Sequence, residues 1–423
     1  AFCQTIGSQF GNIDYQAYQP SIVFINGEYY GIHNIRERSN EKWVKSNFNT
    51  EDSDVIENWV DVKSGSLEHL THMLNVLKEG VTYDQISLMV DVDEMTNYLS
   101  LNFFMANCDF IGNNMLIWRP ANGKWRFLLK DSDQIIGIID GKLDSELNSA
   151  FKKNTIAYYL GDESSMVNDV IKNPKYANYF ISNHIVNIGT YFHEKKTVGI
   201  LDSLANNIEY EIAFHNDKYQ LIDDWYSEIE YMRLWLKNRS YYEAKNLSEF
   251  FGLGKPVPSV ITVTGIETFY MDSLKIKDGK FDGFLFENRE ALLSVDSEVS
   301  WMIHKFKDGK ETIESLQGSQ LRLKSEGLDS LRICIGESYP TDELEKDTER
   351  DLYVPLSYEK GVWFEDVSCI KTITIFNSSG ALVGEYENIK NKNFEIELPE
   401  KNEVYLIRLS DKYENVYIRK FIY

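Results

Sequence analysis

The chain has 423 residues, of which 43% are hydrophobic, 13% aromatic and 26% charged, so its composition is that of a folded protein and not of a disordered one. Its 44 basic and 66 acidic residues give a net charge of −22, which repels phosphate backbones, and we therefore expect no nucleic-acid partner. Because one hydrophobic core stops growing at roughly 250 to 300 residues, we expect two or three domains.

The sequence contains no membrane or metal signature. No run approaches the roughly 18 consecutive apolar residues that a membrane-spanning helix needs, so we expect none. The first residues have neither the basic region nor the apolar region of a signal peptide, which we expect to be absent or already removed. The four cysteines lie far apart without metal-type spacing, and they indicate isolated thiols at Cys3, Cys108, Cys334 and Cys369.

A β-hairpin is predicted near the N-terminus. Two runs rich in β-branched and aromatic residues cover residues 21–25 and 28–35. Asn26 and Gly27 between them tolerate the positive φ angles of a type I′ turn. The sequence therefore predicts two antiparallel strands here.

Helices are predicted after this hairpin. Leucine and methionine recur at helical spacing over residues 67–77. A second apolar stretch, residues 95–105, follows the capping candidates Asp91 and Asp93. We therefore expect two helices between the first hairpin and the next β segment.

A second hairpin is predicted over residues 115–129. Its strands are residues 115–118 and 125–129, joined by a turn at residues 120–123, and it leads directly into Asp131. Helical spacing then returns over residues 201–212 and, with Trp225 at its start, over residues 225–236, so this half of the chain is mainly helical.

The character of the sequence changes near residue 252. Glycine and proline at residues 252–258 disfavour a helix and suit an exposed linker, so we expect a boundary there. We expect an α+β protein with a first domain over residues 1–252, a small Ig-like β-sandwich over 260–340 and a last all-β domain over 345–423. The clearest strand candidates are residues 260–263, 292–295, 320–323, 331–335, 373–376 and 404–409.

Three polar residues have the spacing of a phosphoryl-transfer site. Such a site needs a carboxylate that orients the attacking hydroxyl, and oxygen ligands for Mg²⁺. Asp109 and Asn114 are five positions apart, as are the catalytic Asp and the metal-binding Asn of protein kinases, and Asp131 follows a predicted hairpin. Spacing alone leaves the alternative open, because acidic residues in turns usually bond their own backbone.

Three segments, in this order, resemble motifs of the CotH kinase family. Residues 23–38 are similar to its hairpin N-G-x-Y-x-G-x-Y-x-x-x-E, with His33 where the family often has Tyr. Residues 107–114 are similar to N-x-D-x-x-x-N-N, and residues 125–133 to W-x-x-x-x-x-D-x-D. The resemblance covers about residues 20 to 250.

The resemblance implies an atypical protein-kinase-like fold that binds ATP and Mg²⁺ and phosphorylates Ser or Thr of a protein. Carried over by position, Asp109 is the catalytic base, and Asn114 and Asp131 are metal ligands. Asp133 is the alternative to Asp131 as a ligand. These roles are expectations from the family pattern.

The resemblance also implies an acidic partner for a phosphate-binding cation, and Glu37 has that position. Arg36 and Arg38 are the candidates for the cation, although a side chain beside a hairpin is more often merely solvated. Lys130 stands where the family usually has an apolar or aromatic residue, and a lysine at the edge of a strand can simply point to solvent.

A second hypothesis is a non-catalytic kinase-like scaffold or adhesin, whose β modules bind a surface protein or a glycan. The C-terminal segment resembles the C-terminal β domains of secreted Bacteroidetes proteins. With the Ig-like middle unit, this favours a secreted protein or one associated with the cell surface. The identity of the protein substrate is not indicated by the sequence.

Overall fold

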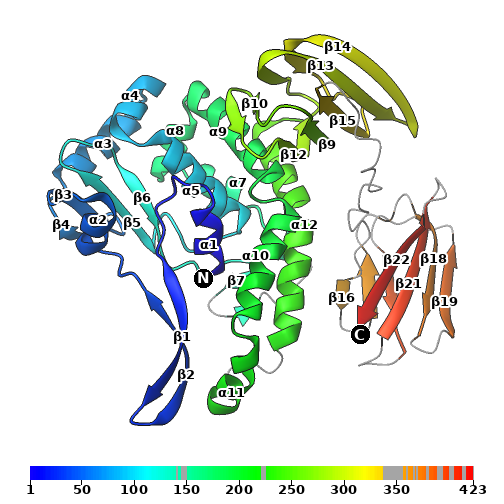
Figure 1. The fold of residues 1–423 in the computed structure, drawn as a ribbon, viewed down its shortest axis with the longest axis horizontal. Coiled ribbons are helices and arrows are strands. Elements are labelled where there is room, and N and C mark those ends of the chain that lie inside the picture. The colour runs from blue at the N-terminus through cyan, green and yellow to red at the C-terminus, as the bar shows by residue number, and fades with distance from the viewer. Residues whose placement is uncertain are drawn as a thin grey trace. The chain divides into compact units, whose positions relative to one another are not determined.

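The chain forms two compact units in a computed structural model. The first comprises residues 1–144 and 151–337, and the second residues 145–150 and 338–423. Both helices and several sheets are present, so the protein is α+β as expected (Figure 1). The structure describes residues 1–139, 142–143, 150–220, 225–336, 356–358, 361–364, 367, 370–377, 381–387, 394–399, 404–411 and 416–422.

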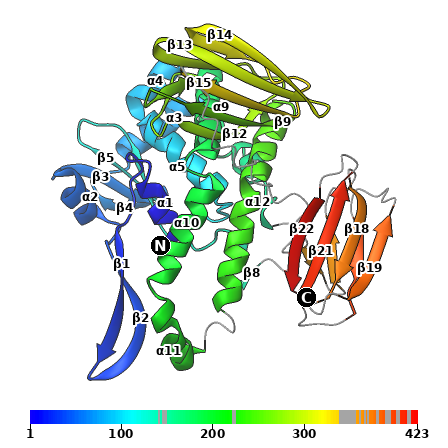
Figure 2. The same ribbon diagram turned by 45° about the vertical axis from the view of Figure 1, so that its right-hand side comes forward.

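The predicted N-terminal hairpin is confirmed as β1 (Tyr18–Ile25) and β2 (Glu28–Arg36). Asn26 and Gly27 have φ angles of 53° and 84°, so the turn uses the left-handed conformation that these two residue types tolerate. The hairpin projects from a four-stranded sheet, and in both views it runs beside one helix, α11 (Glu209–Tyr219) (Figures 1 and 2).

A four-stranded antiparallel sheet carries the second predicted hairpin. Its strand order is β4 (Asp61–Ser64), β3 (Ser53–Glu57), β5 (Met115–Pro120) and β6 (Arg126–Leu129). Helix α2 (Glu41–Phe48) packs on one face of it. The core between them consists of Trp43, Val44, Val55, Leu116, Trp118 and Leu128, all buried.

Helices make up most of the remaining part of the first unit. The two helices predicted after the hairpin are confirmed as α3 and α5, and the Asp91 side chain caps α5 by accepting from the Glu94 amide at 3.2 Å. The helical run predicted over residues 201–212 is divided between α10 and α11. The helix bounds are α1 (Phe2–Ser8), α3 (Glu68–Lys78), α4 (Tyr83–Met89), α5 (Val92–Phe104), α7 (Thr155–Leu160), α8 (Met166–Ile171), α9 (Pro174–Gly189), α10 (Glu194–Asn206) and α12 (Trp225–Phe251).

A buried arginine holds the end of α5. The Arg239 side chain, on α12, is fully buried and donates to the carbonyls of Phe103 and Phe104, each at 2.7 Å. Glu243 balances its charge and also accepts from His184 at 3.0 Å. Because the last carbonyls of a helix lack partners within the helix, this guanidinium fixes the point where the chain leaves α5.

The β segment that follows α12 belongs to the same compact unit. Helix α12 ends at Phe251 and β9 begins at Pro256, so no helix runs through the boundary. The expectation of an exposed linker at residues 252–260 is wrong, because Val257 and Ser259 are fully buried within β9. This strand is hydrogen-bonded on both sides, to β12 and to β15, and has no free edge.

Seven strands form one mixed sheet here, and a two-sheet Ig-like sandwich is not confirmed. Its order is β11, β10, β13, β15, β9 and β12, with β14 paired to β13, and β15 and β9 are parallel. The four strands predicted between residues 260 and 335 lie within it. The bounds are β9 (Pro256–Val263), β10 (Phe269–Met271), β11 (Leu274–Ile276), β12 (Lys280–Phe286), β13 (Ala291–Lys307), β14 (Lys310–Leu323) and β15 (Ser330–Ile335).

This sheet packs tightly against the helices. A Cβ atom added to Gly283 on β12 would lie 2.8 Å from the Cα atom of Gly189 at the end of α9, so the two backbones touch there. Polar pairs surround this contact, with His193 Nε2 at 3.3 Å from Asp282 Oδ2 and Lys196 Nζ at 2.5 Å from Asp278 Oδ2. Close backbone packing and ion pairs therefore join the helices to the sheet.

The second unit contains two sheets around one core. The three-stranded sheet has the order β16 (Leu356–Tyr358), β17 (Gly361–Phe364) and β20 (Phe394–Glu397). The four-stranded sheet has the order β19 (Leu382–Glu387), β18 (Ile370–Phe376), β21 (Val404–Asp411) and β22 (Val416–Ile422), which confirms the last two predicted strands. Buried side chains from both sheets meet, among them Val362, Phe364, Ile373, Ile375, Ile396 and Ile407.

A short hairpin, β7 (Ile138–Ile139) and β8 (Lys142–Leu143), completes the strands of the described residues. Cys3, Cys108 and Cys334 are free thiols, as expected, whereas Cys369 lies outside the described residues. No helix in the described part of the chain is both long and apolar enough to cross a bilayer.

Candidate active site

The register of the four-stranded sheet gathers polar residues at one of its ends. Met115 on β5 lies opposite Leu129 on β6, so Asn114 and Lys130, the next residues outward, leave the hairpin at the same end. The last residue of β3, Glu57, reaches this end too, because β3 pairs with the other edge of β5. Residues distant in the sequence therefore meet there.

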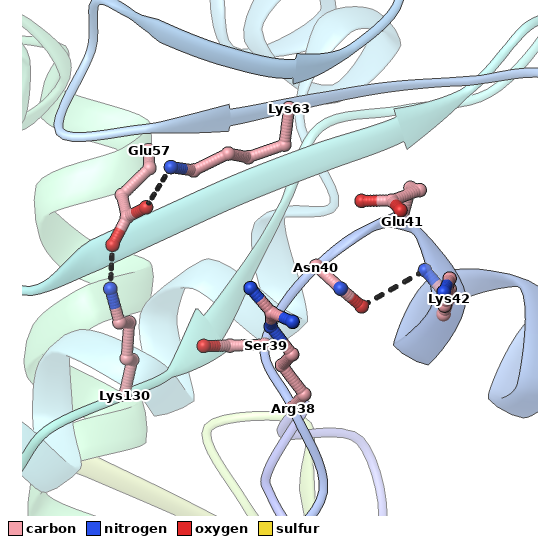
Figure 3. Close-up of a pocket in the computed structure, with 8 residues that line it drawn as sticks. All are labelled: Arg38, Ser39, Asn40, Glu41, Lys42, Glu57, Lys63 and Lys130. Atoms are coloured by element: carbon pink, nitrogen blue, oxygen red, sulfur yellow. Dashed lines mark hydrogen bonds and ion pairs between the residues drawn. The ribbon is translucent and has the colours of Figure 1, made fainter.

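Glu57 forms two ion pairs at this end of the sheet. One carboxylate oxygen contacts the ammonium group of Lys130, and the other lies 2.8 Å from that of Lys63 on β4 (Figure 3). Glu57 and Lys130 share the sheet face that α2 covers, since side chains alternate along a strand and opposed residues share a face. Burial lowers the pKa of Lys130, while the nearby Asp131 carboxylate opposes that shift.

Of the alternatives left open for Lys130, the solvent-facing one does not hold. Only 21% of its side chain is exposed, because the strand directs it toward Glu57 and not away from the protein. Sheet pairing decides this direction, and the sequence around residue 130 does not encode it.

A cleft of about 380 Å³ opens between this end of the sheet and the start of α2. Arg38, one of the two arginines suggested by the sequence, lines it, whereas Arg36 lies on β2 and is not among the lining residues. The lining includes four cationic and two anionic side chains, so the cleft is locally basic in a protein of net charge −22. Its residues are Arg38, Ser39, Asn40, Glu41, Lys42, Glu57, Lys63 and Lys130 (Figure 3).

Glu37 does not line this cleft. Its carboxylate accepts hydrogen bonds from the Ala17 amide at 2.8 Å, the Trp43 indole at 3.2 Å and the Asn47 side chain at 3.2 Å. These contacts brace α2 against the base of the first hairpin. The carboxylate that pairs with lysines in the cleft is Glu57, which we did not predict from the sequence.

A local signal for Glu57 and Lys63 does exist in the sequence. Val55 and Ile56 precede Glu57, and Val62 precedes Lys63, so two short β-rich runs flank the turn at residues 58–60. A hairpin prediction there would have placed both charged side chains near one strand end.

The loop that follows α5 fixes the Asp109 carboxylate. Its oxygens accept from the Asn114 side-chain amide at 2.8 Å and from that of Asn113 at 3.2 Å. The Asp109 amide donates to Asn107 Oδ1 at 3.0 Å. Ile111 and Asn114 have positive φ angles of 69° and 51°, and such a conformation is costly for a β-branched residue.

The chain after β6 returns alongside this loop. The Cys108 amide donates to the Gln134 carbonyl at 3.1 Å, and the Ile136 amide donates to the Met105 carbonyl at 3.0 Å. Asp131, with a φ of 43°, and Asp133 are both exposed on this returning segment. The segment that carries Asp131 and Asp133 thus lies beside the loop that carries Asp109.

In the described part of the chain, the side-chain hydrogen bonds to the Asp109 carboxylate come from Asn113 and Asn114. Among the residues that the structure describes, no three His, Cys, Asp or Glu side chains group together as metal ligands would. Asp109, Asp131 and Asp133 therefore do not form a preassembled three-carboxylate site. A Mg²⁺ site can also use only two protein ligands, here Asn114 and one carboxylate. Such a site does not require three acidic, histidine or cysteine side chains close together.

The turn between β3 and β4 couples the cleft to the Asp109 loop. The Asn58 side chain donates to Asn113 Oδ1 at 3.1 Å, and the Trp59 indole donates to the Ile111 carbonyl. Asn58 directly follows Glu57 in the chain, so one short segment contacts both parts of the site. The β3–β4 turn therefore links the basic cleft to the loop in which Asn113 and Asn114 orient the Asp109 carboxylate.

The chain matches the model of a known protein family. Residues 1–242, more than half of the chain, match the family model described as CotH kinase protein. Curated proteins gave no match to this chain. The matched region includes the four-stranded sheet, the cleft and the Asp109 loop.

Glu57→Gln should lower the pKa of the Lys130 ammonium group by about one unit or more, because an opposite charge in contact favours the charged form. Burial already lowers the pKa of Lys130, and loss of the Glu57 charge should lower it further. NMR titration of the lysine side chains measures the change. Glu41→Gln, which removes the same charge from the other wall of the cleft, is the control, and an equal shift in both variants would contradict the pairing.

Proposed function

The chain belongs to the CotH kinase protein family, and on that premise we propose that it transfers the terminal phosphoryl group of ATP to a serine or threonine hydroxyl of a protein. The observation that carries the proposal is the basic cleft with Glu57 shared between Lys63 and Lys130. A strongly acidic protein attracts a polyphosphate only where cations are gathered locally, as they are here.

Lys63 and Lys130 are the proposed phosphate-binding cations. In protein kinases, the lysine that contacts the nucleotide phosphates is held by a glutamate. Glu57 supplies that constraint here, and Arg38 adds a guanidinium on the opposite wall (Figure 3). Arginine suits this place because its planar fork of donors matches phosphate oxygens.

Asp109 is the proposed catalytic base. The acceptor hydroxyl oxygen attacks the terminal phosphorus and gives up its proton to the Asp109 carboxylate. A new oxygen–phosphorus bond forms, the bond to the bridging oxygen breaks, and the nucleoside diphosphate leaves with that electron pair. Asn113 and Asn114 hold the carboxylate in one orientation, so little reorganisation is needed when the hydroxyl arrives.

The residues around Asp109 fit a magnesium ion that enters with the nucleotide. Asn114 donates its amide group to Asp109, which leaves its oxygen, Oδ1, as a ligand atom. Mg²⁺ commonly takes one or two carboxylates together with substrate phosphates, and exposed Asp131 or Asp133 would supply the carboxylate. When bound, Mg²⁺ would neutralise charge on the phosphates.

We place the acceptor protein outside the cell or at its surface as part of this proposal. The family match supports a kinase-like domain, and the acceptor itself follows only from that resemblance. The non-catalytic scaffold that binds a surface protein or glycan is the alternative, and it predicts no phosphate transfer by the unaltered protein.

Asp109→Asn should reduce phosphate transfer by about 10²-fold or more, because it removes the proton acceptor and keeps the size of the side chain. The measurement is incorporation of label from γ-³²P-ATP, with Mg²⁺, into a mixture of Ser- and Thr-containing peptides. Asp84→Asn is the matched control, since Asp84 is exposed and paired with Lys175 on another surface. Undiminished transfer by Asp109→Asn would remove Asp109 from the mechanism, and no transfer by the wild type would favour the scaffold.

Asp131→Asn should raise the Mg²⁺ concentration needed for half-maximal transfer about tenfold or more, because a neutral amide is a weaker ligand for a hard cation. The fold should persist, since Asp131 is exposed. Asp133→Asn, two residues away, is the matched comparison in a Mg²⁺ titration of the same assay. A larger effect of Asp133→Asn would make Asp133 the ligand, and no effect of either substitution would contradict this metal site.

A further inference from the structure

The lining of the cleft is unusual for a nucleotide site because none of its eight residues is of an apolar or aromatic type. All eight side chains end in polar or charged groups, from Arg38 at one wall to Lys130 at the other. Small-molecule sites are mostly lined by hydrophobic and aromatic side chains, which hold the flat faces of a ring such as a nucleobase. The residues that line this cleft offer no aromatic ring on which a base could stack.

Two of the acceptors that could read the edge of a base, on Asn40 and Glu57, are already occupied. The Asn40 Oδ1 atom accepts from the amides of Lys42 at 3.1 Å and Trp43 at 3.4 Å, because it caps α2. Both carboxylate oxygens of Glu57 contact lysines. Among the lining side chains, the neutral groups that make no hydrogen bond to another lining residue are the Ser39 hydroxyl and the Asn40 side-chain nitrogen.

The cations of the cleft suit a chain of phosphates. Lys63 and Lys130 line it from the sheet, and Arg38 and Lys42 line it from the segment that begins α2 (Figure 3). Every phosphate of a triphosphate carries negative charge, whatever base is attached. Positive charge on two facing walls can contact successive phosphates, and such contacts carry no information about the base.

We propose that this cleft selects its phosphoryl donor by the polyphosphate chain and not by the base. GTP and CTP then serve as donors about as well as ATP, and inorganic tripolyphosphate occupies the same cleft. In each case the acceptor hydroxyl oxygen bonds to the terminal phosphorus, the bridging bond breaks, and the diphosphate leaves with the electron pair. This inference rests on the proposed phosphoryl transfer and names the class of donor for it.

Calorimetric titration of the full chain with the Mg²⁺ complexes of ATP, GTP, CTP and tripolyphosphate tests the inference. We expect dissociation constants for the three nucleotides within about threefold of one another, and displacement of ATP by tripolyphosphate. Lys63→Gln should weaken all four ligands by a similar factor, about tenfold, because it removes one phosphate contact common to them. Lys175→Gln, on the exposed surface of α9, removes a paired lysine elsewhere and should change none of them.

The outcomes separate this inference from the proposed function. ATP binding at least tenfold tighter than GTP and CTP overturns the inference and leaves the kinase proposal standing. Equal nucleotide affinities without displacement by tripolyphosphate also overturn it, because the cleft would then not hold the phosphates. Failure of all four ligands to bind overturns both proposals.

Discussion

The antiparallel register of β3, β5 and β6 is the constraint on which the candidate site depends. Because side chains alternate along a strand, a slip of one residue would turn Glu57 and Lys130 to opposite faces of the sheet. The same slip would move Trp118 and Leu128 out of the core beneath α2, where both are buried. Hydrophobic packing of α2 therefore fixes the ion pairs of the cleft, although none of the apolar residues belongs to it.

A second constraint comes from the buried charges behind the site. Arg239 bonds the last carbonyls of α5 and is neutralised by Glu243, so the Asp109 loop starts from a fixed point. Removing one partner of such a pair would leave an uncompensated buried charge, which typically costs about 3–5 kcal/mol. The left-handed conformation of Ile111 is costly for a β-branched residue, and the bond that its carbonyl accepts from the Trp59 indole supports it.

The sequence indicated the local features of this protein and missed the long-range ones. The two hairpins, helices α3 and α5, and the Asp109 and Asp131 segments follow from turn residues, periodicity and motif spacing, all of which are local signals. Glu57 and Lys63 lie on strands of five and four residues, whose short β-rich runs are a local signal that we did not use. The partner of Lys130 is distant in the sequence, so no pattern around Lys130 could identify it.

The same limit explains the errors in the β segments. Glycine and proline at residues 252–258 suited a linker, yet β9 is an interior strand because β12 and β15 both pair with it. The prolines of β9 are a local signal that is typical of a domain boundary. The burial of β9 instead depends on β12 and β15, which come later in the chain. Glu37 likewise has the position of the family's motif, and only the fold shows that its carboxylate faces Trp43 and Asn47.

In the proposed mechanism, the cleft beside Glu57 holds the phosphates of the donor next to Asp109. A crystal structure of the protein with Mg²⁺ and a non-hydrolysable ATP analogue would show where the phosphates bind. We expect phosphate oxygens within hydrogen-bonding distance of Lys63 and Lys130, with the terminal phosphate closest to Asp109. Phosphates bound outside the cleft, with Lys130 and Lys63 still in their ion pairs with Glu57 and no phosphate oxygen near either, would contradict this mechanism.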